Sequence, residues 1–323
     1  MTNGPFRLRA WEPGRAMILE RYPAYHGRFE GNLQRVELSL RADLTAGLGA
    51  YEADALDALD ITFFSPAELD RARQRHAGEY VSAPRPSTLY IAFDLTRPPF
   101  DDTRVRRAFA LATHREELVN VVLKGSHSAA TGGFVPPGMP GHSAGIGLPY
   151  DAEGARRLLA EAGYPGGEGF PQVQAELYRG LESQGDYLRT QWREVLGVDI
   201  TWEALEFADF LDRLRGRQPD IWIVGWWAKY PDPDHFLRAG PDPKRTGWRN
   251  QVFDRLVEEA RMVTDQEERL KLYAEAERIL VEEAAIIPLI HWRWHRLVKP
   301  WVKRFPSSGI YLPAWKHVII EPH

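Results

Sequence analysis

Residues 225–236, with the sequence GWWAKYPDPDHF, bring aromatic and charged side chains together in one short stretch. The preceding run, residues 220–224, is short, β-branched and aromatic, which predicts a buried strand. Two prolines then end the strand and leave the aromatic residues on a loop beyond its carboxyl end. In open α/β sheets ligands bind at that edge. We therefore expect a binding surface that includes Trp226, Trp227 and Tyr230, with a well-packed surface loop as the alternative.

Two pairs of residues have spacings that occur in metal sites. His291 and His295 stand four residues apart, which could chelate zinc on a helix, but no Glu follows His291 as the metalloprotease motif requires. Pro288 and the apolar residues around it predict a strand instead. Asp232 and Asp234 resemble the first two ligands of a calcium loop, but the required Gly and distal Glu are missing. We expect packed or surface histidines and no metal ion.

Signatures of catalysis are scarce in this sequence. It contains no phosphate-cradling Gly-x-x-x-x-Gly-Lys-Ser/Thr loop. Ser126 stands beside His127 and Ser143 beside His142, but adjacent side chains rarely point at each other and nothing marks a third partner. We interpret both pairs as loop composition. The sequence therefore predicts a binding protein that is not an enzyme, with no catalytic residue and no cofactor.

The composition is that of a globular α/β protein. The 323 residues exceed a typical single domain and suggest two lobes, and the 44% of hydrophobic residues can bury a core. The formal net charge of −4 argues against direct nucleic-acid contact, which needs a basic patch. The absence of cysteine excludes disulfides, cysteine-based zinc sites and thiol nucleophiles. No run approaches the roughly 20 apolar residues that a membrane span needs.

Alternation of strands and helices predicts βαβ units and an at least partly parallel sheet. Alternating apolar residues on both sides of residues 12–14 predict a hairpin, and Ser65 and Glu68 form a capping-box pattern at the start of a helix. Asp102 and Asp151 are expected to cap two more helices. We predict further strands at residues 36–40, 88–95, 173–178, 198–204 and from 286, and further helices at residues 186–196, 207–215, 251–263 and 266–283.

Several motifs occur in one order over nearly the whole chain. Residues 225–236 fit the pattern Gly-Trp-x-x-Asp-Tyr-x-Asp-Pro-x-x-Phe, except that Lys229 replaces the first Asp. Residues 3–27 contain Gly-Pro-Phe, Trp-Glu-Pro-Gly and Glu-Arg-Tyr-Pro-Ala-Tyr-His-Gly, and three more motifs lie at residues 90–110, 155–164 and 287–289. Together they make the chain resemble the family 5 extracellular solute-binding proteins, the peptide and nickel receptors of ABC transporters.

This resemblance implies an α/β, two-lobed periplasmic-binding-protein-like fold (type II, peptide-receptor cluster) with one lobe incomplete. Residues 93–287 would form the complete ligand-binding lobe, and residues 1–92 with 288–323 would form a partial domain I. The chain would cross between the lobes near Phe93 and near Pro288, and such receptors close around their ligand by hinge rotation. The chains of the family normally continue further upstream, and the sequence given does not include that segment.

The resemblance also points to ligand-binding residues. The peptide receptors usually carry an Asp for the ligand's amino terminus where this chain has Lys229. A lysine facing the cleft would attract carboxylate or phosphate and repel ammonium, so we expect that recognition of a free peptide amino terminus is lost. The alternative is that Lys229 points to solvent and pairs with Asp232 or Asp234. The predicted ligand-binding set is Trp226, Trp227, Lys229, Tyr230, Asp232, Tyr178 and Arg179.

Tyr178 and Arg179 belong to this set because they end a strand where the family places ligand contacts. Arg179 could hold a ligand carboxylate in a bidentate fork. Each residue of the set has a structural alternative, since Trp and Arg also occur at core edges and in surface pairs. The set contains no catalytic and no metal-binding residue.

The function implied by the resemblance is that of the solute-binding component of an ABC-type peptide or oligopeptide importer. It would bind a peptide or other small solute between its lobes, without catalysis, and deliver it to an ABC permease. The family is expected in the periplasm or at the cell surface. Residues 1–5 do not read as a signal peptide, so the chain would be cytoplasmic if it is complete or fused to a regulator. The alternative function is the intracellular ligand-sensing domain of a transcriptional regulator with the same fold.

An incomplete lobe would leave an unpaired sheet edge. Dimerisation could close such an edge, so a homodimer through the incomplete lobe is a further hypothesis. A strictly monomeric protein that unfolds cooperatively, seen by sedimentation and calorimetry, would count against it.

Overall fold

The computed structural model describes residues 2–40, 43–306 and 314–323. The chain forms two compact units. The first unit comprises Met1–Pro84 and Arg293–His323, and the second comprises Arg85–Trp292. Each unit has its own hydrophobic core, because the buried apolar residues gather in separate clusters. Among the residues that the structure describes, no helix is long and apolar enough to cross a membrane.

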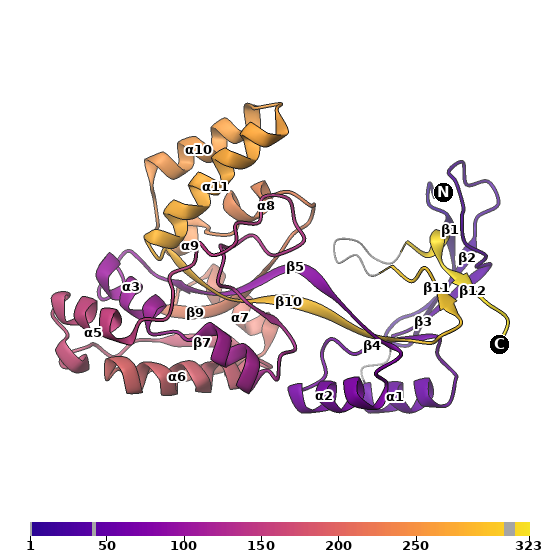
Figure 1. Ribbon diagram of the computed structural model, residues 1–323, viewed down its shortest axis with the longest axis horizontal. Helices are drawn as coiled ribbons and strands as arrows, with labels where there is room; N and C mark the ends of the chain where they lie inside the picture. Colours follow the sequence, from indigo (N-terminus) through magenta and orange to yellow (C-terminus); the bar gives the residue numbers. More distant parts are fainter. Residues whose placement is uncertain (1, 41–42, 307–313) are drawn as a thin grey trace. The chain divides into compact units, whose positions relative to one another are not determined.

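Two long strands connect the units. Both β5 (Tyr80–Phe93) and β10 (Ile286–Val298) begin in one unit and end in the other (Figure 1). Phe93 and Pro288, near which the sequence places the two crossings, belong to these strands. The description of the first unit as a partial domain stays a prediction.

The first unit contains a small antiparallel sheet and two helices. The sheet has the order β1-β2-β3, with β1 (Phe6–Glu12), β2 (Ala16–Arg21) and β3 (Arg35–Ser39). The predicted hairpin and the strand after it are therefore confirmed. The other elements of this unit are α1 (Leu44–Glu52), β4 (Ala58–Asp60), α2 (Pro66–Arg75), β11 (Val302–Lys303), a 3₁₀ turn (Trp315–His317) and β12 (Ile319–Ile320).

Helix α2 begins with the capping box that the sequence predicts. The Ser65 hydroxyl accepts from the backbone N–H of Glu68, and the Glu68 carboxylate accepts from the backbone N–H of Ser65. Two N–H groups that a helix start would otherwise leave unpaired are satisfied in this way. One face of the helix then buries Leu69 and Ala72 beside Tyr51 in the core of the first unit.

A mixed sheet forms the centre of the second unit. Strand β5 runs antiparallel to β9 (Ile221–Trp227), while β7 (Ala175–Tyr178) runs parallel to both β9 and β8 (Trp202–Leu205). The predicted partly parallel sheet is confirmed. At the other side of β5 lies β10, to which the short strand β6 (Ser128–Ala129) pairs.

Three helices cover one face of this sheet: α3 (Thr103–Leu111), α5 (Ala152–Glu161) and α6 (Glu182–Leu196). Side chains alternate along a strand, so Leu89 and Ile91 of β5 lie on the same face and pack with Phe109 and Trp192 of these helices. The side chains of Asp102 and Asp151 accept from backbone N–H groups at the starts of α3 and α5, as predicted.

The second unit contains further helices and helical turns. They are α4 (Arg115–Glu117) with a π-helical turn (Leu118–Val122), a 3₁₀ turn (Pro165–Gly167), α7 (Phe207–Arg215), α8 (Asp234–Leu237), α9 (Pro243–Thr246), α10 (Gln251–Met262) and α11 (Gln266–Glu282). Helices α10 and α11 pack against each other as a pair (Figure 1). The bounds of α7, α10 and α11 agree with the predicted ranges to within one residue. Helix α6 and strand β5 begin earlier than predicted, and strand β8 begins later.

One carboxylate is wholly buried in the second unit. The side chain of Glu277, on α11, lies against the backbone of Gly133, where a Cβ would collide with it. Its Oε1 accepts from the backbone N–H of Val135 at 2.7 Å, and its Oε2 has no hydrogen-bond partner within the described part of the chain. Burial raises the pKa of Glu277 to about 7, against the opposing effect of hydrogen bonds from Val135, Ser143 and Phe134.

This pKa predicts a pH-dependent stability. Between the usual carboxyl pKa and about 7, the folded protein holds a proton that the unfolded chain has released, so stability falls as the pH rises through this window. The fall reaches at most about 1.4 kcal/mol per pH unit. We expect Glu277→Gln, which keeps an acceptor oxygen for the backbone N–H of Val135, to lose this pH-dependent part of the free energy of unfolding. Denaturant unfolding at pH 5 and pH 7 measures it.

A suitable control is Glu282→Gln, which changes an exposed carboxyl near the end of the same helix. It should leave the pH dependence of the wild type unchanged. Equal pH dependence in the wild type and in Glu277→Gln would show that the buried carboxyl does not titrate in this range.

Candidate functional site

The aromatic loop begins where the β5–β9 ladder ends. Thr88 lies opposite Trp226 and Ser87 lies opposite Trp227, and the backbone N–H of Ala228 then donates to the carbonyl oxygen of Pro86 at 2.9 Å. Beyond this bond the chain turns through Pro231 into α8. The loop thus leaves the sheet at the carboxyl end of a strand that is parallel to β7, which is the edge where ligands bind in such sheets.

His235 holds two of the predicted aromatic residues in place. Its ring stacks on that of Trp226, with centroids 5.3 Å apart, and meets the ring of Tyr230 edge-on at 5.0 Å. The indole N–H of Trp226 also donates to the carbonyl oxygen of His235 at 2.9 Å. Burial and the nearby positive charges of Lys229 and Arg238 lower the pKa of His235, so its ring is neutral at pH 7.

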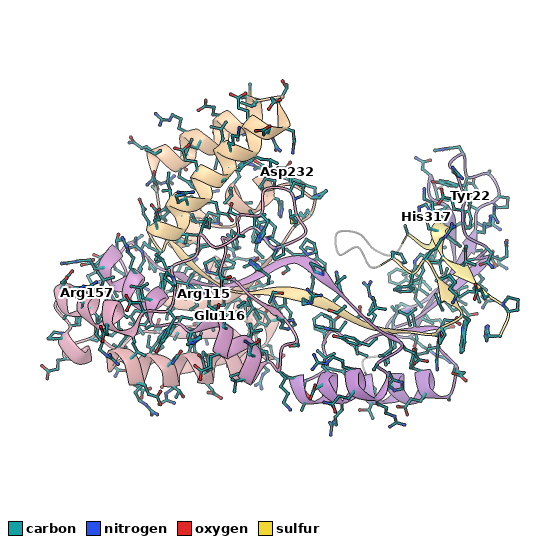
Figure 2. All side chains as sticks on the ribbon, viewed as in Figure 1. Tyr22, Arg115, Glu116, Arg157, Asp232 and His317 are labelled. Atoms are coloured by element: carbon teal, nitrogen blue, oxygen red, sulfur yellow. The ribbon has the colours of Figure 1, made fainter. Side chains whose placement is uncertain are left out.

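Two arginines neutralise the acidic residues of the loop. Asp232 accepts from Arg269 of α11 at 2.7 Å, and Figure 2 shows Asp232 near α8. Asp234 is buried and accepts from Arg238 through Oδ2 at 2.9 Å and from the hydroxyl of Tyr230 at 2.7 Å. These contacts attach the loop to α8 and α11 at several points.

The charge state of Asp234 follows from its partners. Burial by itself would raise the pKa of the Asp234 carboxyl, but hydrogen bonds from Arg238, Tyr230 and Tyr273 outweigh it and the pKa is lowered. The carboxylate is therefore ionised at neutral pH and holds Tyr230 as a hydrogen-bond donor. Its partners contribute stability that is present above the usual carboxyl pKa and is lost as the pH falls through the lowered value.

Trp227 and Trp226 project from opposite faces of the β5–β9 ribbon. Its side chain is 44% exposed, and the guanidinium carbon of Arg85 lies 3.6 Å from the centroid of its ring. Arg85 itself is buried, with the ring of Trp292 at 5.9 Å on another side. A guanidinium this close to an indole face is held by a cation–π contact.

Lys229 is exposed at the tip of the loop. No carboxylate of residues 2–40, 43–306 and 314–323 lies within 4 Å of its ammonium. The alternative pairing with Asp232 or Asp234 is not formed, since the first is bound to Arg269 and the second to Arg238.

Tyr178 and Arg179 have different surroundings. The ring of Tyr178 packs against Phe207 and Phe210 of α7, and burial raises the pKa of its hydroxyl to about 12, while Arg85 acts in the opposite direction. A Cβ at Gly225 would lie 3.7 Å from this hydroxyl, so Tyr178 borders the loop. Arg179 is exposed and its guanidinium is bound to Glu206 at 2.7 Å.

The structure thus brings together Trp226, Tyr230 and Asp232 through direct contacts with the loop's own residues, and it places Trp227 and Tyr178 near Arg85. Sequence reasoning missed the residues that hold these side chains, namely Arg85, His235, Arg238 and Arg269. Asp234 and Arg238 have the i, i+4 spacing of an ion pair on a helix, and this spacing could have predicted their contact from the sequence.

The two histidines considered for a metal lie on β10, as the predicted strand requires. His291 is buried, and its Nδ1 lies 2.9 Å from the hydroxyl of Thr88; burial and the neighbouring His142 lower its pKa to about 3. His295 stacks on Tyr80 in the first unit. Among the described residues no group of three or more His, Asp or Glu side chains could hold a metal ion.

Residues 141–145, with the sequence GHSAG, also fit the Gly-x-Ser-x-Gly pattern of a nucleophile elbow. They lie in a loop between β6 and α5 rather than in the strand-to-helix turn that this motif needs. His142 is bound through Nδ1 to the carbonyl oxygen of Val135, and Ser143 hydrogen-bonds Glu277. The pattern is therefore structural in this chain.

The described cavities lie apart from the predicted residues. One of about 230 Å³ in the second unit is bordered by Arg238, Trp248 and Phe253. Another of about 340 Å³ in the first unit is bordered by Phe6, Trp315 and Lys316. The aromatic loop is thus an open edge of the second unit rather than the wall of either cavity.

The profile of the bacterial extracellular solute-binding proteins, family 5 Middle, matches residues 1–247. The chain belongs to this family. It is a family of solute-binding proteins without catalysis, associated with ABC transporters of peptides. The resemblance seen in the sequence motifs is confirmed.

Two curated relatives are also solute-binding proteins, and both are longer than this chain. The chain is 28% identical over 319 residues to the periplasmic oligopeptide-binding protein of Escherichia coli, covering 94% of this chain and 57% of that protein. It is 28% identical over 317 residues to the probable deoxycholate-binding periplasmic protein YgiS of the same organism, covering 94% and 58%. The chain therefore spans less than two thirds of the length of these family 5 proteins.

A solved structure shows the same fold. The crystal structure of NikA from Brucella suis in complex with Fe(III)-EDTA has a TM-score of 0.81 to this chain at 23% identity, and covers 99% of this chain and 68% of that one. The fold is the mixed α/β periplasmic-binding-protein fold that the sequence predicts.

The loop network predicts the effect of one substitution. Asp234→Asn removes the charge that holds Arg238 and Tyr230, and we expect it to destabilise the protein by about 2 kcal/mol, because hydrogen bonds to a charged group are lost at a buried position. Denaturant unfolding measures the change. Asp212→Asn breaks the exposed pair with Arg215 and should cost less than about 0.5 kcal/mol. Equal effects of the two substitutions would contradict a structural role of the network.

Proposed function

We propose that this chain is the solute-binding part of an ABC-type importer, which binds a peptide or other small solute at the aromatic loop and releases it unchanged. Membership of family 5 supports this function, as do relatives that are named for binding oligopeptides. The chain covers 57% of the first of these relatives, so the activity of that whole protein is a proposal for this chain.

The observation that carries the proposal is the construction of the loop at the carboxyl edge of β9. Trp226 and Tyr230 are oriented by His235, and both acidic residues are bound to arginines, so contacts within the protein hold the conformation of the loop. A rigid aromatic surface binds at low entropic cost, because few side chains need to be ordered on association.

Lys229 determines which end of a peptide this surface rejects. Its ammonium is exposed and lies where the peptide receptors usually carry an Asp, so a protonated amino terminus would meet a like charge. We infer that the ligand is a solute whose recognised end is not a free amine. In this reading Trp226, Trp227, Tyr230 and Tyr178 contribute contact area, while Asp232 and Arg179 maintain the surface around them.

The partners and location follow from the same proposal. The solute would be passed to an ABC permease, and the protein would act in the periplasm or at the cell surface, where its relatives are named as periplasmic. The homodimer expected from an incomplete lobe has no support in the relatives and remains a hypothesis.

The ligand's amino end provides the test. A mixed-sequence tripeptide library, offered with free and with N-acetylated amino ends in equal amounts, should give complexes of the acetylated form because Lys229 repels ammonium. Native mass spectrometry reads out both forms at once. Lys229→Asp should reverse the preference toward the free amine, by about tenfold in the ratio of bound forms.

Lys271→Gln is the matched control, since it removes an exposed lysine that pairs with Glu267 on α11. It should leave the ratio as in the wild type. A clear preference of the wild type for the free amine would show that Lys229 does not face the bound ligand.

A further inference from the structure

Residues 131–147 form a compact loop in the second unit, which we call the backing loop. Its ends meet, because the backbone N–H of Gly147 donates to the carbonyl oxygen of Thr131 at 2.9 Å. Phe134 and Val135 within it are wholly buried. Loops with adjacent ends pack through their own side chains, so these two residues attach the backing loop to the rest of the unit.

The backing loop packs against the aromatic loop at two points. The ring of Phe134 meets the ring of Phe236 edge-on, with centroids 5.1 Å apart. A Cβ at Gly141 would lie 3.0 Å from Cγ of Pro233, so the two backbones approach closely just before α8. Phe236 directly follows His235, the residue that orients the predicted aromatic side chains. The backing loop therefore supports the segment on which the aromatic surface depends.

Glu277 joins the backing loop to α11. Its Oε1 accepts from the backbone N–H of Val135 at 2.7 Å, and its carboxyl group fills the space that a side chain at Gly133 would need. A second attachment comes from β5, where the hydroxyl of Thr88 donates to the carbonyl oxygen of Phe134 at 2.8 Å. One carboxyl group and one hydroxyl group thus hold adjacent residues of the loop.

The surroundings of Glu277 favour its neutral form. Among the residues that the structure describes, no Lys, Arg or His nitrogen lies within 4 Å of its carboxyl oxygens. His291 of β10 is neutral, because burial and the nearby His142 lower its pKa to about 3, and His142 is bound through Nδ1 to the carbonyl oxygen of Val135. Tyr273, one turn earlier on α11, keeps its proton because burial raises its pKa to about 12.

The other polar groups near this packing belong to existing pairs. Asp234 of α8 accepts from Arg238 at 2.9 Å and from the hydroxyl of Tyr273 at 3.4 Å. Ser143 of the backing loop hydrogen-bonds Glu277, and this bond lowers the pKa of Glu277 by less than burial raises it. Helix α10 packs on α11 through apolar buried residues, namely Phe253, Leu256, Val257 and Ala260.

Loss of the proton from Glu277 leaves a buried carboxylate without a counter-charge, which is unfavourable. Opening of the backing loop exposes this carboxylate to water and relieves the cost. The packed loop keeps the proton up to about pH 7, whereas an open loop releases it near the usual carboxyl pKa. The packed form is therefore fully favoured below that usual pKa and loses stability as the pH rises from there to about 7.

We propose that Glu277 is a positioning residue for solute binding, which acts through the backing loop to keep Pro233, Phe236 and the aromatic surface in the binding conformation, and that loss of its proton releases both the loop and the solute. The inference rests on the proposed function, because the solute is the one bound at the aromatic loop. A proton on Glu277 and the solute then favour each other's binding, since coupling between two sites is reciprocal.

Solute affinity at two pH values tests this coupling. The N-acetylated tripeptide library is titrated against the 323-residue protein at about pH 5.5 and about pH 8, and native mass spectrometry measures the bound fraction. We expect the affinity of the wild type to be about tenfold lower at the higher pH, because each pH unit within the window changes the equilibrium by up to tenfold. Glu277→Gln, which is neutral at both pH values, should bind at both as the wild type does at the lower one.

Hydrogen exchange of the protein without solute locates the change. In the wild type the amides of residues 131–147 should lose protection as the pH rises, after correction for the intrinsic pH dependence of exchange, and in Glu277→Gln they should not. The amides of α6 are the internal reference and should keep their protection. An equal loss in α6 would indicate unfolding of the whole unit rather than release of the loop, and would overturn the proposal.

Glu282→Gln is the matched control, since it removes an exposed carboxyl from the same helix and should keep the wild-type pH dependence of affinity. Other titrating groups, such as His235, affect the wild type and both variants alike. If Glu277 only supported the fold, Glu277→Gln would change stability and leave the pH dependence of affinity as it is in the wild type.

The possible failures are distinguishable. Equal wild-type affinity at the two pH values, or a pH dependence that persists in Glu277→Gln, would overturn the positioning role and leave the solute-binding function standing. The absence of any complex of the wild type at either pH would contradict the proposed function itself, and the inference with it.

Discussion

The register of the β5–β9 ladder is the constraint on which the candidate site depends. Because Ser87 lies opposite Trp227, the two adjacent tryptophans project from opposite faces, one toward His235 and the other toward Arg85. A shift of one residue would exchange these faces and separate Trp226 from His235 and Trp227 from Arg85. The ladder is held by the hydrophobic face that Leu89 and Ile91 present to the helices, so the core of the second unit also fixes the site.

The loop beyond the ladder keeps its shape through charge pairs rather than through burial of apolar groups. Two aspartates each engage one arginine, and the more buried of them also orders Tyr230. Because arginines already neutralise these aspartates, the aspartates attract an ammonium group less strongly than free carboxylates would. Under the proposed function, the exposed lysine would then set the sign of the potential that a solute meets at this edge.

Much of this fold could be predicted from the sequence, since local signals specify it. Asp102, Asp151 and Ser65 stand at helix starts as their capping chemistry requires, and the apolar run after residue 220 forms a central strand. The start of β5 was missed because Pro84 and Pro86 interrupt its pattern, although the carbonyl of the second still joins the ladder. Propensity alone cannot show that a tertiary partner will extend a strand through prolines.

The candidate site could be predicted only in part. The aromatic residues and Lys229 belong to one motif, so the sequence already places them on one loop. Arg85 and Arg269 lie far from this motif in the sequence and reach it only through the fold. Arg179 was expected to hold a ligand, and its pairing with Glu206 depends on where α7 begins. Contacts of this kind arise from sheet register and helix packing, which single-sequence patterns do not contain.

The claim at the centre of this account is that the chain binds a small solute and releases it unaltered. Native mass spectrometry of the 323-residue protein as purified, without refolding, tests this most directly, with the released ligand identified by its fragmentation. The account predicts a non-covalent complex with an intact solute whose recognised end is not a free amine. A ligand-free mass that persists after incubation with the acetylated tripeptide library would contradict it.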